Sequence, residues 1–393
     1  MIGTGTFEIT EKMREYITDI LNTGQISYGP YSRKFEQEFA RIHQRKYAIL
    51  SNSGTSSLLV ALQTLKELHG WQDGDEVIVP ALTFVATVNV VLQSNLRPVL
   101  VDIEPDCYGI DTEKIQAAIT PRTKAIIPVH TFGQPCDILE IVDIAAAHHD
   151  LVIIEDSCEA MFINSQGRPV GGWGDIACYS TYMAHLITTG VGGLALTDNP
   201  DYAKTMRSLV NHGLSYGDLS NSDNGFDPHK TRRDFVFERV GHSFRITEFE
   251  AALGLAQLDR WEDMITHRQF NAGCLINGLA RWRDQLQLPK TRSGVSHSYM
   301  MFPIVCKQAG VRDRLTRFLE GKGIQTRRML PLTCQPVYRN LFCENDYPVA
   351  KWINDNGFYI GCHQGLSMDD LIFVIGAFGE FFDKTGVLGW KKQ

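Results

Sequence analysis

Residues 178–193, CYSTYMAHLITTGVGG, form the stretch that decides the fold. The segment begins as an apolar strand, passes through a polar turn that contains His185, and enters a second strand through glycines 190, 192 and 193. Glycines let the backbone approach a ligand closely or adopt a positive φ. A single histidine in such a turn is more often structural, but its ordinary pKa of about 6.5 also suits it to accept and return a proton.

Short apolar strands alternate with amphipathic helices on both sides of this stretch. Near-continuous Val/Ile/Leu runs of this kind are typical of a mainly parallel sheet with helices on both faces, so the sequence predicts an α/β fold. The polar residues follow the carboxyl ends of the strands, where such sheets bind ligands. The expected strands are 47–54, 75–84, 97–103, 124–133, 151–158, 176–181 and 192–198, with a helix at 55–68.

The remainder of the chain predicts a second, smaller α/β unit. Residues 214–242 are polar and aperiodic and are expected to form a long loop, with a hairpin as one alternative near residue 237. Residues 245–279 read as a long, interrupted helix, and strands and helices alternate again from residue 294. We therefore predict a large domain over 1–245 and a connecting helix with a smaller domain over 246–393.

Composition excludes several classes of protein. The net charge of −7 argues against non-specific binding to nucleic acid or to an anionic membrane. The first twenty residues lack the pattern of a secretory signal, and no apolar run is long enough to span a membrane. The nine cysteines form no C-x-C or C-x-x-C pair, which indicates reduced thiols in a cytoplasmic protein and no metal site.

Two further motifs could carry chemistry. NSGTSS, residues 52–57, lies between a strand and a helix, where backbone N–H groups and the helix dipole favour a phosphate, although the motif is also an ordinary turn and N-cap. VIIEDSCEAM places Asp156 and Glu159 just after an apolar strand. A buried acid there needs a partner, such as a protonated ring nitrogen of a cofactor, unless Asp156 simply caps a helix.

In this order along the chain, these motifs resemble the fold-type I, pyridoxal-phosphate-dependent sugar aminotransferase family named after DegT, DnrJ, EryC and StrS. The resemblance covers nearly the whole chain, with motifs from GQISYGPYSRKFEQEFA at residue 24 to FRITEFEAALGLAQLDR at residue 244 and NGFYIGCHQGLS at residue 356. It implies that Gly54, Thr55 and Ser180 hold the cofactor phosphate, that Phe84 stacks on the pyridine ring, and that Asp156 pairs with the pyridinium nitrogen. Members of the family bury the cofactor between subunits, which implies a homodimer.

The resemblance also assigns roles to two residues at which this chain is unusual. Glu159 occupies a position near the ring's 3-hydroxyl where most members carry Gln or His. His185 replaces the lysine that ordinary members attach to the cofactor, so the cofactor is expected to bind without a covalent bond. A subgroup with this histidine comprises 3-dehydratases of nucleotide-linked 4-keto-6-deoxyhexoses, which use pyridoxamine phosphate and regain it from glutamate.

Within that subgroup, the resemblance favours the branch without an iron–sulfur cluster, which acts on GDP-4-keto-6-deoxymannose, because the 214–242 loop contains no cysteine. Ser243 stands where the family usually has an Asn that reaches the phosphate from the partner subunit, and Val191 stands where most members have Glu. An unusual aminotransferase or lyase and a non-catalytic cofactor-binding relative remain alternatives. Further candidates for substrate or partner contacts, each equally compatible with a structural role, are His212, Arg245, Arg327 and His363.

Overall fold

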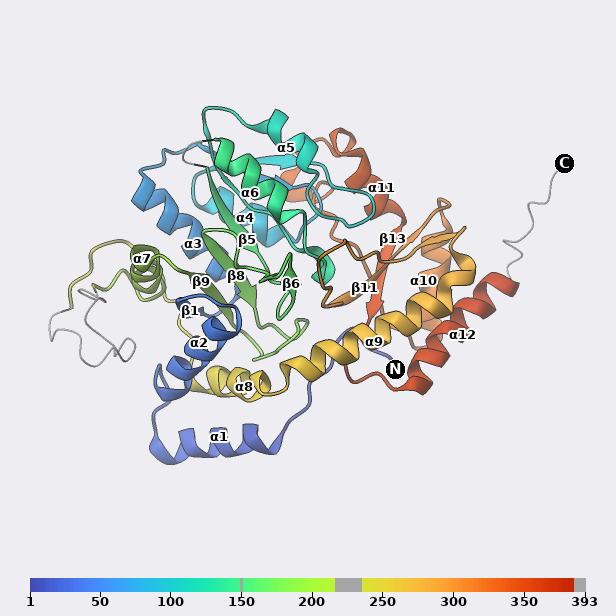
Figure 1. Ribbon diagram of the computed structural model, residues 1–393, viewed down its shortest axis with the longest axis horizontal. Helices are drawn as coiled ribbons and strands as arrows, with labels where there is room; N and C mark the ends of the chain where they lie inside the picture. Colours follow the sequence, from blue (N-terminus) through green and yellow to red (C-terminus); the bar gives the residue numbers. More distant parts are fainter. Residues whose placement is uncertain (149–150, 216–234, 385–393) are drawn as a thin grey trace.

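A seven-stranded sheet lies at the centre of the larger part of the protein (Figure 1). The computed structural model describes residues 1–148, 151–215 and 235–384. The strand order is β1-β9-β8-β5-β4-β2-β3, and β9 alone runs antiparallel to its neighbours. The strands are β1 (Tyr47–Ser51), β2 (Glu76–Pro80), β3 (Arg97–Val101), β4 (Thr123–Ile126), β5 (Val152–Asp156), β8 (Ile176–Ser180) and β9 (Gly193–Thr197).

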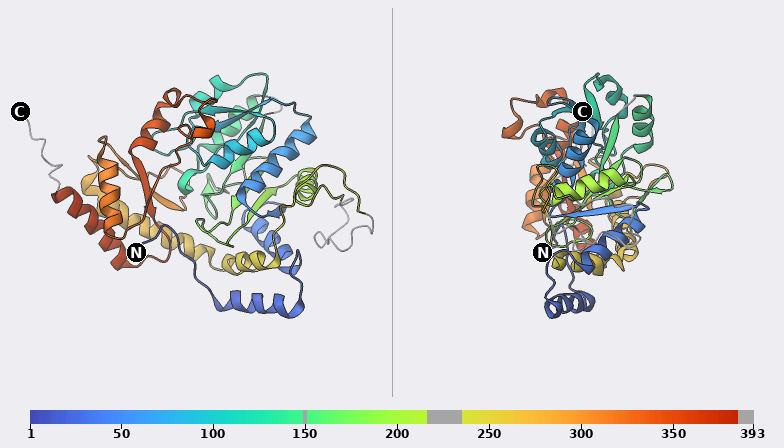
Figure 2. Two further views of the ribbon diagram at one scale, coloured as in Figure 1. Left: turned by 180° about the vertical axis from the view of Figure 1, so that it is seen from behind. Right: turned by 90° about the vertical axis from the view of Figure 1, so that its left-hand side faces the viewer.

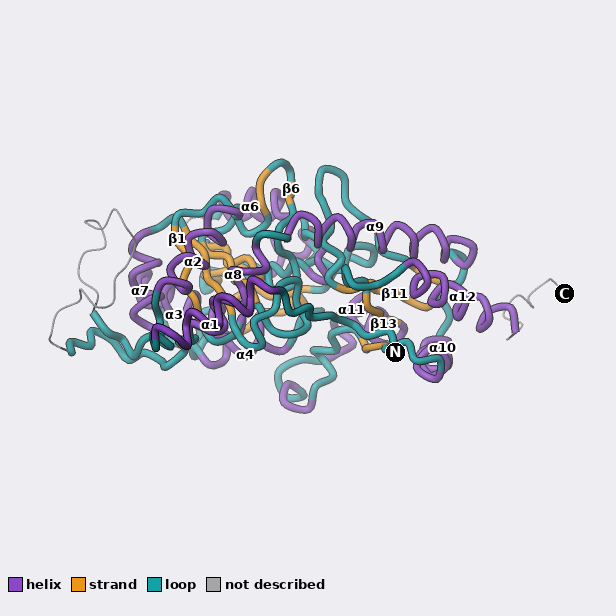
Figure 3. The backbone as a smooth tube through the Cα atoms, turned by 90° about the horizontal axis from the view of Figure 1, so that it is seen from below, coloured by secondary structure: helices purple, strands orange, loops and turns teal. Residues whose placement is uncertain are grey.

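Alternating side chains of these strands enter two separate apolar cores, one on each face of the sheet. Val77 and Val79 of β2 join one core, whereas Ile78 between them joins the other. Because successive strand residues point to opposite faces, an apolar run without polar gaps is what a sheet covered on both sides requires. Seen from below, the strands lie between helices, with α6 on one side and α4 on the other (Figure 3).

Helices of the larger part connect these strands or pack at their edge. α3 covers β8 and β9, whereas α6 packs against β5 on the opposite face. A short two-stranded ribbon, β6 (Asn164–Ser165) with β7 (Arg168–Pro169), and a 3-10 turn, η1 (Thr131–Gly133), complete this part. The helices are α1 (Glu11–Thr23), α2 (Pro30–Ile42), α3 (Gly54–His69), α4 (Val85–Gln93), α5 (Thr112–Ala118), α6 (Ile138–Ala147) and α7 (Pro200–Val210).

The C-terminal part contains a four-stranded antiparallel sheet in the order β10-β11-β13-β12. It has an apolar core of its own, formed with α9, α10 and α12, and Ile2 near the N-terminus bridges to Ile324 of this part. Its elements are η3 (Ala280–Trp282), β10 (Leu286–Gln287), β11 (Met301–Cys306), α10 (Val311–Gly321), β12 (Thr326–Arg328), η4 (Pro336–Tyr338), η5 (Glu344–Asp346), α11 (Pro348–Asn356), β13 (Gly357–Gly361) and α12 (Met368–Lys384).

Two consecutive helices join the two sheets. The predicted interrupted helix is present as α8 (Glu248–Leu258) and α9 (Trp261–Leu279), with the break at residues 259–260. Met264 and Ile265 at the start of α9 belong to the core of the larger part, and Leu275 and Leu279 belong to that of the smaller part. Figure 2 shows this connection from behind. Because α9 contributes to both cores, this single helix fixes the small sheet against the large one.

All seven predicted strands are confirmed, as is the helix expected at 55–68. Near residue 237, where a hairpin was one alternative, Phe237 forms an antiparallel bridge to Leu214, so the two sides of the predicted loop pair with each other. The middle of that loop, residues 216–234, lies outside the described residues. None of the described helices combines the length and apolar character needed to cross a membrane.

Candidate functional site

A cavity of about 490 Å³ opens at the carboxyl ends of the parallel strands. It is bounded by residues that follow β1, β2, β4, β5 and β8 and by the beginning of the antiparallel β9. Met300, Met301 and Tyr359 from the smaller part close its other side. Among the eight site residues predicted from sequence, those that line this cavity are Gly54, Thr55, Phe84, Asp156, Glu159, Ser180 and His185.

One corner of the cavity is formed by the N-terminus of α3. Ser53 caps this helix by accepting a hydrogen bond from the Ser56 N–H at 3.0 Å. The first turn of a helix leaves backbone N–H groups unpaired within the helix and favours an anion. Gly54 is packed so closely that a Cβ there would lie 2.7 Å from Ser180 Cβ and 2.8 Å from Cys158 Sγ. The glycine therefore allows the helix end and the Ser180 hydroxyl to face the same space.

Asp156 ends β5 as a buried carboxylate in the cavity wall. Its Oδ2 accepts a hydrogen bond from Thr87 Oγ1 at 2.9 Å, and its Oδ1 accepts one from the Cys158 N–H at 3.3 Å. Burial raises the pKa of Asp156 above its ordinary value because these donors are neutral and replace only part of the lost hydration. A cation placed in the cavity would reverse this effect, so the site is suited to a positively charged ring.

Glu159 lies three residues beyond Asp156, in the same wall. Its Oε2 accepts a hydrogen bond from the Phe132 N–H at 2.5 Å, in a turn where Phe132 adopts a φ of 59°. Burial, together with the neighbouring charge of Asp156, raises the pKa of Glu159 to about 7. Near neutral pH this carboxyl group can therefore either donate or accept a hydrogen bond.

His185 presents an imidazole to the cavity. Its Nδ1 is buried, and no described residue offers this atom a hydrogen bond. Burial lowers the pKa of His185 to about 4, although a hydrogen bond to the backbone of Cys158 opposes the shift. At pH 7 the ring is therefore neutral and can act as a base, and it becomes an acid only after it has taken a proton. No lysine is among the described residues that line the cavity.

Phe84 and two other large side chains at the cavity remain exposed. The exposed fractions are 60% for Phe84, 56% for Tyr182 and 50% for Val191. An aromatic ring at the mouth of a cavity can stack on a planar ligand or pack against a neighbouring molecule. Phe84 thus lies on the open side of the cavity, and its stacking on a cofactor ring stays a prediction.

The eighth predicted residue, Ser243, lies outside the cavity, in a small cluster with Arg245 and His212. Arg245 donates hydrogen bonds to Ser243 Oγ at 3.1 Å and to His212 Nε2 at 3.0 Å. Neither Arg327 of β12 nor the buried His363 lines the cavity. Within one chain, the candidate contact residues are therefore separate from the cavity.

Sequence reasoning missed several residues of the site. Thr87, which donates a hydrogen bond to Asp156, belongs to α4 and gave only a weak signal because it reads as an ordinary helix residue. Met300, Met301 and Tyr359 come from a different sheet, and nothing local in the sequence connects them to residues 54 or 156. A polar residue near the start of a helix that follows a strand end was the one signal that could have found Thr87.

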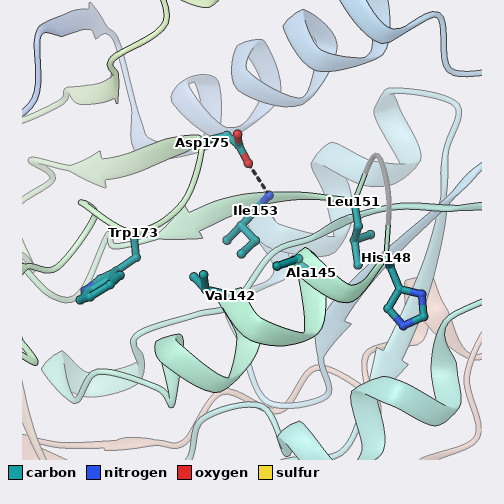
Figure 4. A pocket seen from close by; sticks show the side chains of 8 residues that line it. Val142, Ala145, His148, Leu151, Ile153, Trp173 and Asp175 are labelled. Carbon is teal, nitrogen blue, oxygen red and sulfur yellow. Dashed lines mark hydrogen bonds between the residues drawn. The ribbon is translucent and has the colours of Figure 1, made fainter.

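A second hollow, of about 370 Å³, lies at the amino end of β5, opposite the cavity just described (Figure 4). Most of the residues around it have apolar side chains, and the Asp175 carboxylate accepts a hydrogen bond from the Ile153 N–H at 2.9 Å. Asp175 thus has a structural role there. The nine cysteines are free thiols, and the described part of the chain holds no group of three or more His, Cys, Asp or Glu side chains suited to a metal ion.

Comparison with known proteins supplies relatives for this architecture. Residues 8–379 match the DegT/DnrJ/EryC1/StrS aminotransferase family. The chain is 35% identical over 368 residues to GDP-perosamine synthase of Caulobacter vibrioides, with 93% of this chain and 94% of that protein covered. It is 33% identical over 385 residues to dTDP-4-dehydro-2,6-dideoxy-D-glucose 3-dehydratase of Saccharopolyspora spinosa, with 92% and 82% covered.

Solved structures agree with this assignment of the fold. The E. coli GDP-4-keto-6-deoxy-D-mannose-3-dehydratase with bound hydrated PLP superposes with a TM-score of 0.86 at 25% identity, covering 96% of this chain and 99% of that chain. The fold is therefore that of the fold-type I pyridoxal-phosphate enzymes.

The cavity fits pyridoxal phosphate, the cofactor of this family. A phosphate requires hydrogen-bond donors, and the start of α3 lies beside the Ser180 hydroxyl. A protonated pyridine requires a buried anion, and Asp156 has only neutral partners. His185 adds an imidazole that is neutral at pH 7 to the lining of the same cavity. The volume of about 490 Å³ lies within the range of small-molecule sites.

Proposed function

Because the chain belongs to the DegT/DnrJ/EryC1/StrS aminotransferase family, we propose that it is a pyridoxamine-phosphate-dependent 3-dehydratase of a nucleotide-linked 4-keto-6-deoxyhexose. The observation that carries this proposal is His185. This imidazole occupies the cavity where a transaminase of the family needs a lysine, and no lysine lines the cavity in the described residues. The names of relatives support a nucleotide-sugar substrate.

The other residues of the cavity are assigned supporting roles. The first turn of α3 with Gly54 and Thr55, together with Ser180, would hold the cofactor phosphate, and Phe84 would cover the ring. Asp156 would pair with the ring nitrogen and keep it protonated. Glu159 would face the ring's 3-oxygen, to which its carboxyl group with a pKa of about 7 can donate a proton.

When bound, pyridoxamine phosphate supplies an amine that condenses with the C4 ketone and a ring that withdraws electrons. His185 would remove a proton from the cofactor's C4′ carbon, because its low pKa keeps the imidazole neutral beforehand. The protonated imidazole would then protonate the hydroxyl group that leaves C3. The same side chain would move protons when glutamate restores the amine.

A sugar aminotransferase is the second candidate function. The GDP-perosamine synthases among the relatives favour it, at 35% identity for the protein from Caulobacter vibrioides. The two activities give different products from one substrate. A dehydratase removes the C3 hydroxyl and releases ammonia, whereas an aminotransferase keeps that hydroxyl and leaves an amino group at C4.

The test incubates the purified chain with pyridoxamine phosphate, glutamate and GDP-4-keto-6-deoxymannose and identifies the products by mass spectrometry. We expect a 3-deoxy sugar with release of ammonia and 2-oxoglutarate. An amino sugar that retains the C3 hydroxyl would establish the second candidate instead. If glutamate converts the cofactor but GDP-4-keto-6-deoxymannose stays unchanged, this sugar nucleotide is not the substrate.

Two variants of His185 test its role directly. His185→Asn should keep cofactor affinity within about three-fold and lower turnover by about 100-fold or more, the usual contribution of a general base. His185→Lys should allow borohydride to fix pyridoxal phosphate covalently to the protein, which the wild-type chain should not permit. Unchanged turnover in His185→Asn would remove this histidine from the mechanism.

A homodimer completes the proposal. The exposed side chains of Phe84, Tyr182 and Val191 at the cavity would be covered by a second copy, which would bring its Ser243 and Arg245 toward the site. Sedimentation velocity of the cofactor-loaded protein should give a single species of twice the chain mass.

A further inference from the structure

We propose that Gln257 is a positioning residue that holds the loop carrying His185, an inference that rests on the proposed role of His185. Gln257 lies in the last turn of α8, outside the lining of the cavity. Its Oε1 accepts a hydrogen bond from the Thr188 N–H at 3.0 Å, and its Nε2 donates one to the Thr188 carbonyl at 2.7 Å. The Gln257 carboxamide thus both accepts a hydrogen bond from the backbone of Thr188 and donates one to it.

Contacts between its two ends close the loop of residues 181–190, and His185 lies between those ends. Tyr182 bridges to Gly190, and the hydroxyl groups of Thr181 and Thr189 lie 2.6 Å apart, so both ends of the loop are pinned together. The His185 N–H donates a hydrogen bond to the Tyr182 carbonyl at 2.9 Å. Beyond these contacts, the orientation of the loop depends on what its residues 186–188 bind.

Two kinds of contact hold residues 186–188. Leu186 and Ile187 are buried in the apolar core, which fixes the depth of the loop but is not directional. The hydrogen bonds of Gln257 are directional and act on the two peptide groups on either side of the Thr188 Cα. Because His185 has no covalent bond to a cofactor in this proposal, its aim at the C4′ carbon depends on these contacts together with its hydrogen bond to the backbone of Cys158.

α8 is well suited to act as the support. At its first turn, the buried Glu248 carboxylate accepts hydrogen bonds from the backbone N–H groups of Gly29, Tyr31 and Ser32 at 2.8–2.9 Å. These bonds fix α8 to the N-terminus of α2. The Nε2 of Gln257 also donates to the Leu253 carbonyl of its own helix at 2.8 Å, which restricts the carboxamide to one orientation. The loop is therefore tied to an element that is itself anchored.

The test compares Gln257→Met, which removes both hydrogen bonds, with Gln257→Glu, which keeps the acceptor for the Thr188 N–H and loses the donor. Gln287→Met is the matched control, because Gln287 Nε2 also binds a backbone carbonyl, that of Pro105, at 2.7 Å. Acylation of His185 by diethyl pyrocarbonate in the cofactor-free protein is followed by peptide mass mapping. This readout requires no turnover and is independent of the substrate.

We expect Gln257→Met to raise the acylation rate of His185 by about five-fold or more, which corresponds to one ordinary hydrogen bond, with a smaller increase in Gln257→Glu. Deuterium uptake should rise in residues 181–192 and stay unchanged elsewhere. With substrate, turnover should fall by about 10- to 100-fold while KM changes by less than about three-fold, because positioning and not binding is lost.

Several results would overturn the inference. They are a His185 acylation rate equal to that of the wild-type chain, an increase as large in Gln287→Met, and increased loop exchange without any loss of turnover. If the wild-type chain does not dehydrate the sugar nucleotide, the proposed function fails by itself. The acylation and exchange measurements then still decide whether Gln257 holds the loop.

Discussion

Glu155 and Asp156 are consecutive buried carboxylates at the end of β5, but they face opposite sides of the sheet and have different surroundings. Glu155 accepts hydrogen bonds from three backbone N–H groups of residues 171–174 at 2.6–2.8 Å and lies 3.1 Å from His130 Nε2. His130 Nδ1 in turn accepts a hydrogen bond from the Cys136 N–H. Asp156 has the Thr87 hydroxyl, one N–H group and an open cavity.

The difference in hydrogen-bond donors separates a structural acid from a ligand-binding one. Burial alone would raise the pKa of both carboxyl groups. For Glu155, the hydrogen bonds from His130 and the backbone outweigh burial and lower its pKa, whereas for Asp156 burial prevails and the pKa is raised. A buried carboxylate with all its donors inside the protein serves the fold. One that lacks them is available to a cationic ligand.

Among substitutions of these carboxylates, replacing Glu155 should cause the largest loss of stability. Glu155→Ala leaves three backbone N–H groups and His130 without an acceptor, so we expect the free energy of unfolding to fall by about 3–5 kcal/mol. Chemical denaturation of the cofactor-free protein measures this loss. Glu113→Ala, at an exposed position in α5, is the control and should change stability by less than about 0.5 kcal/mol. A loss below about 1 kcal/mol in Glu155→Ala would contradict a structural role.

A third carboxyl group, Glu159, extends the comparison, because its ionisation should make the stability of the protein depend on pH. Its pKa of about 7 in the folded chain exceeds the ordinary 4.5, so its contribution to stability is complete below pH 4.5 and is lost as the pH rises through 7. Glu159→Gln should therefore gain stability relative to the wild-type chain across this window. The gain is at most about 3 kcal/mol, reduced by the part of the side chain that remains exposed.

Denaturation of both proteins at pH 4 and pH 8 measures this difference. Equal stability differences at the two pH values would show that Glu159 ionises normally in the folded chain. Asp156 should contribute in the same direction as Glu159, and Glu155 in the opposite one, because its lowered pKa adds stability that is lost as the pH falls.

Local sequence predicts the strands and most of the cavity, for a physical reason. Apolar runs mark strands covered on both faces, and parallel strands place their carboxyl ends at one edge, so Gly54, Asp156 and Ser180 could be expected to meet. The same pattern does not distinguish Glu155 from Asp156. Both faces of the sheet are buried, and only the turn at 171–174 and His130 make one of the two acids structural.

Contacts between distant segments could not be predicted in this way. Met300 and Tyr359 reach the cavity because α9 fixes the small sheet against the large one, and Gln257 reaches Thr188 from a different helix. Hydrophobic periodicity identifies those helices and strands but does not specify how their polar side chains meet. The residues that position a site are thus harder to find than those that line it.

Replacing Asp156 should change the stability of the fold least and should selectively weaken cofactor binding. Asp156→Asn keeps the size of the side chain; its oxygen can accept the hydrogen bond from the Cys158 N–H while its NH2 group donates one to Thr87 Oγ1, so the stability of the cofactor-free protein should change by less than about 1 kcal/mol. Cofactor affinity should fall by about 10- to 100-fold, since a hydrogen bond to a charged group contributes about 1.5–3 kcal/mol. Absorbance titration with pyridoxamine phosphate measures this loss. If Asp156→Asn instead unfolds the protein as Glu155→Ala does, both carboxylates serve the fold. If it leaves affinity unchanged, the open side of Asp156 does not face the ring nitrogen.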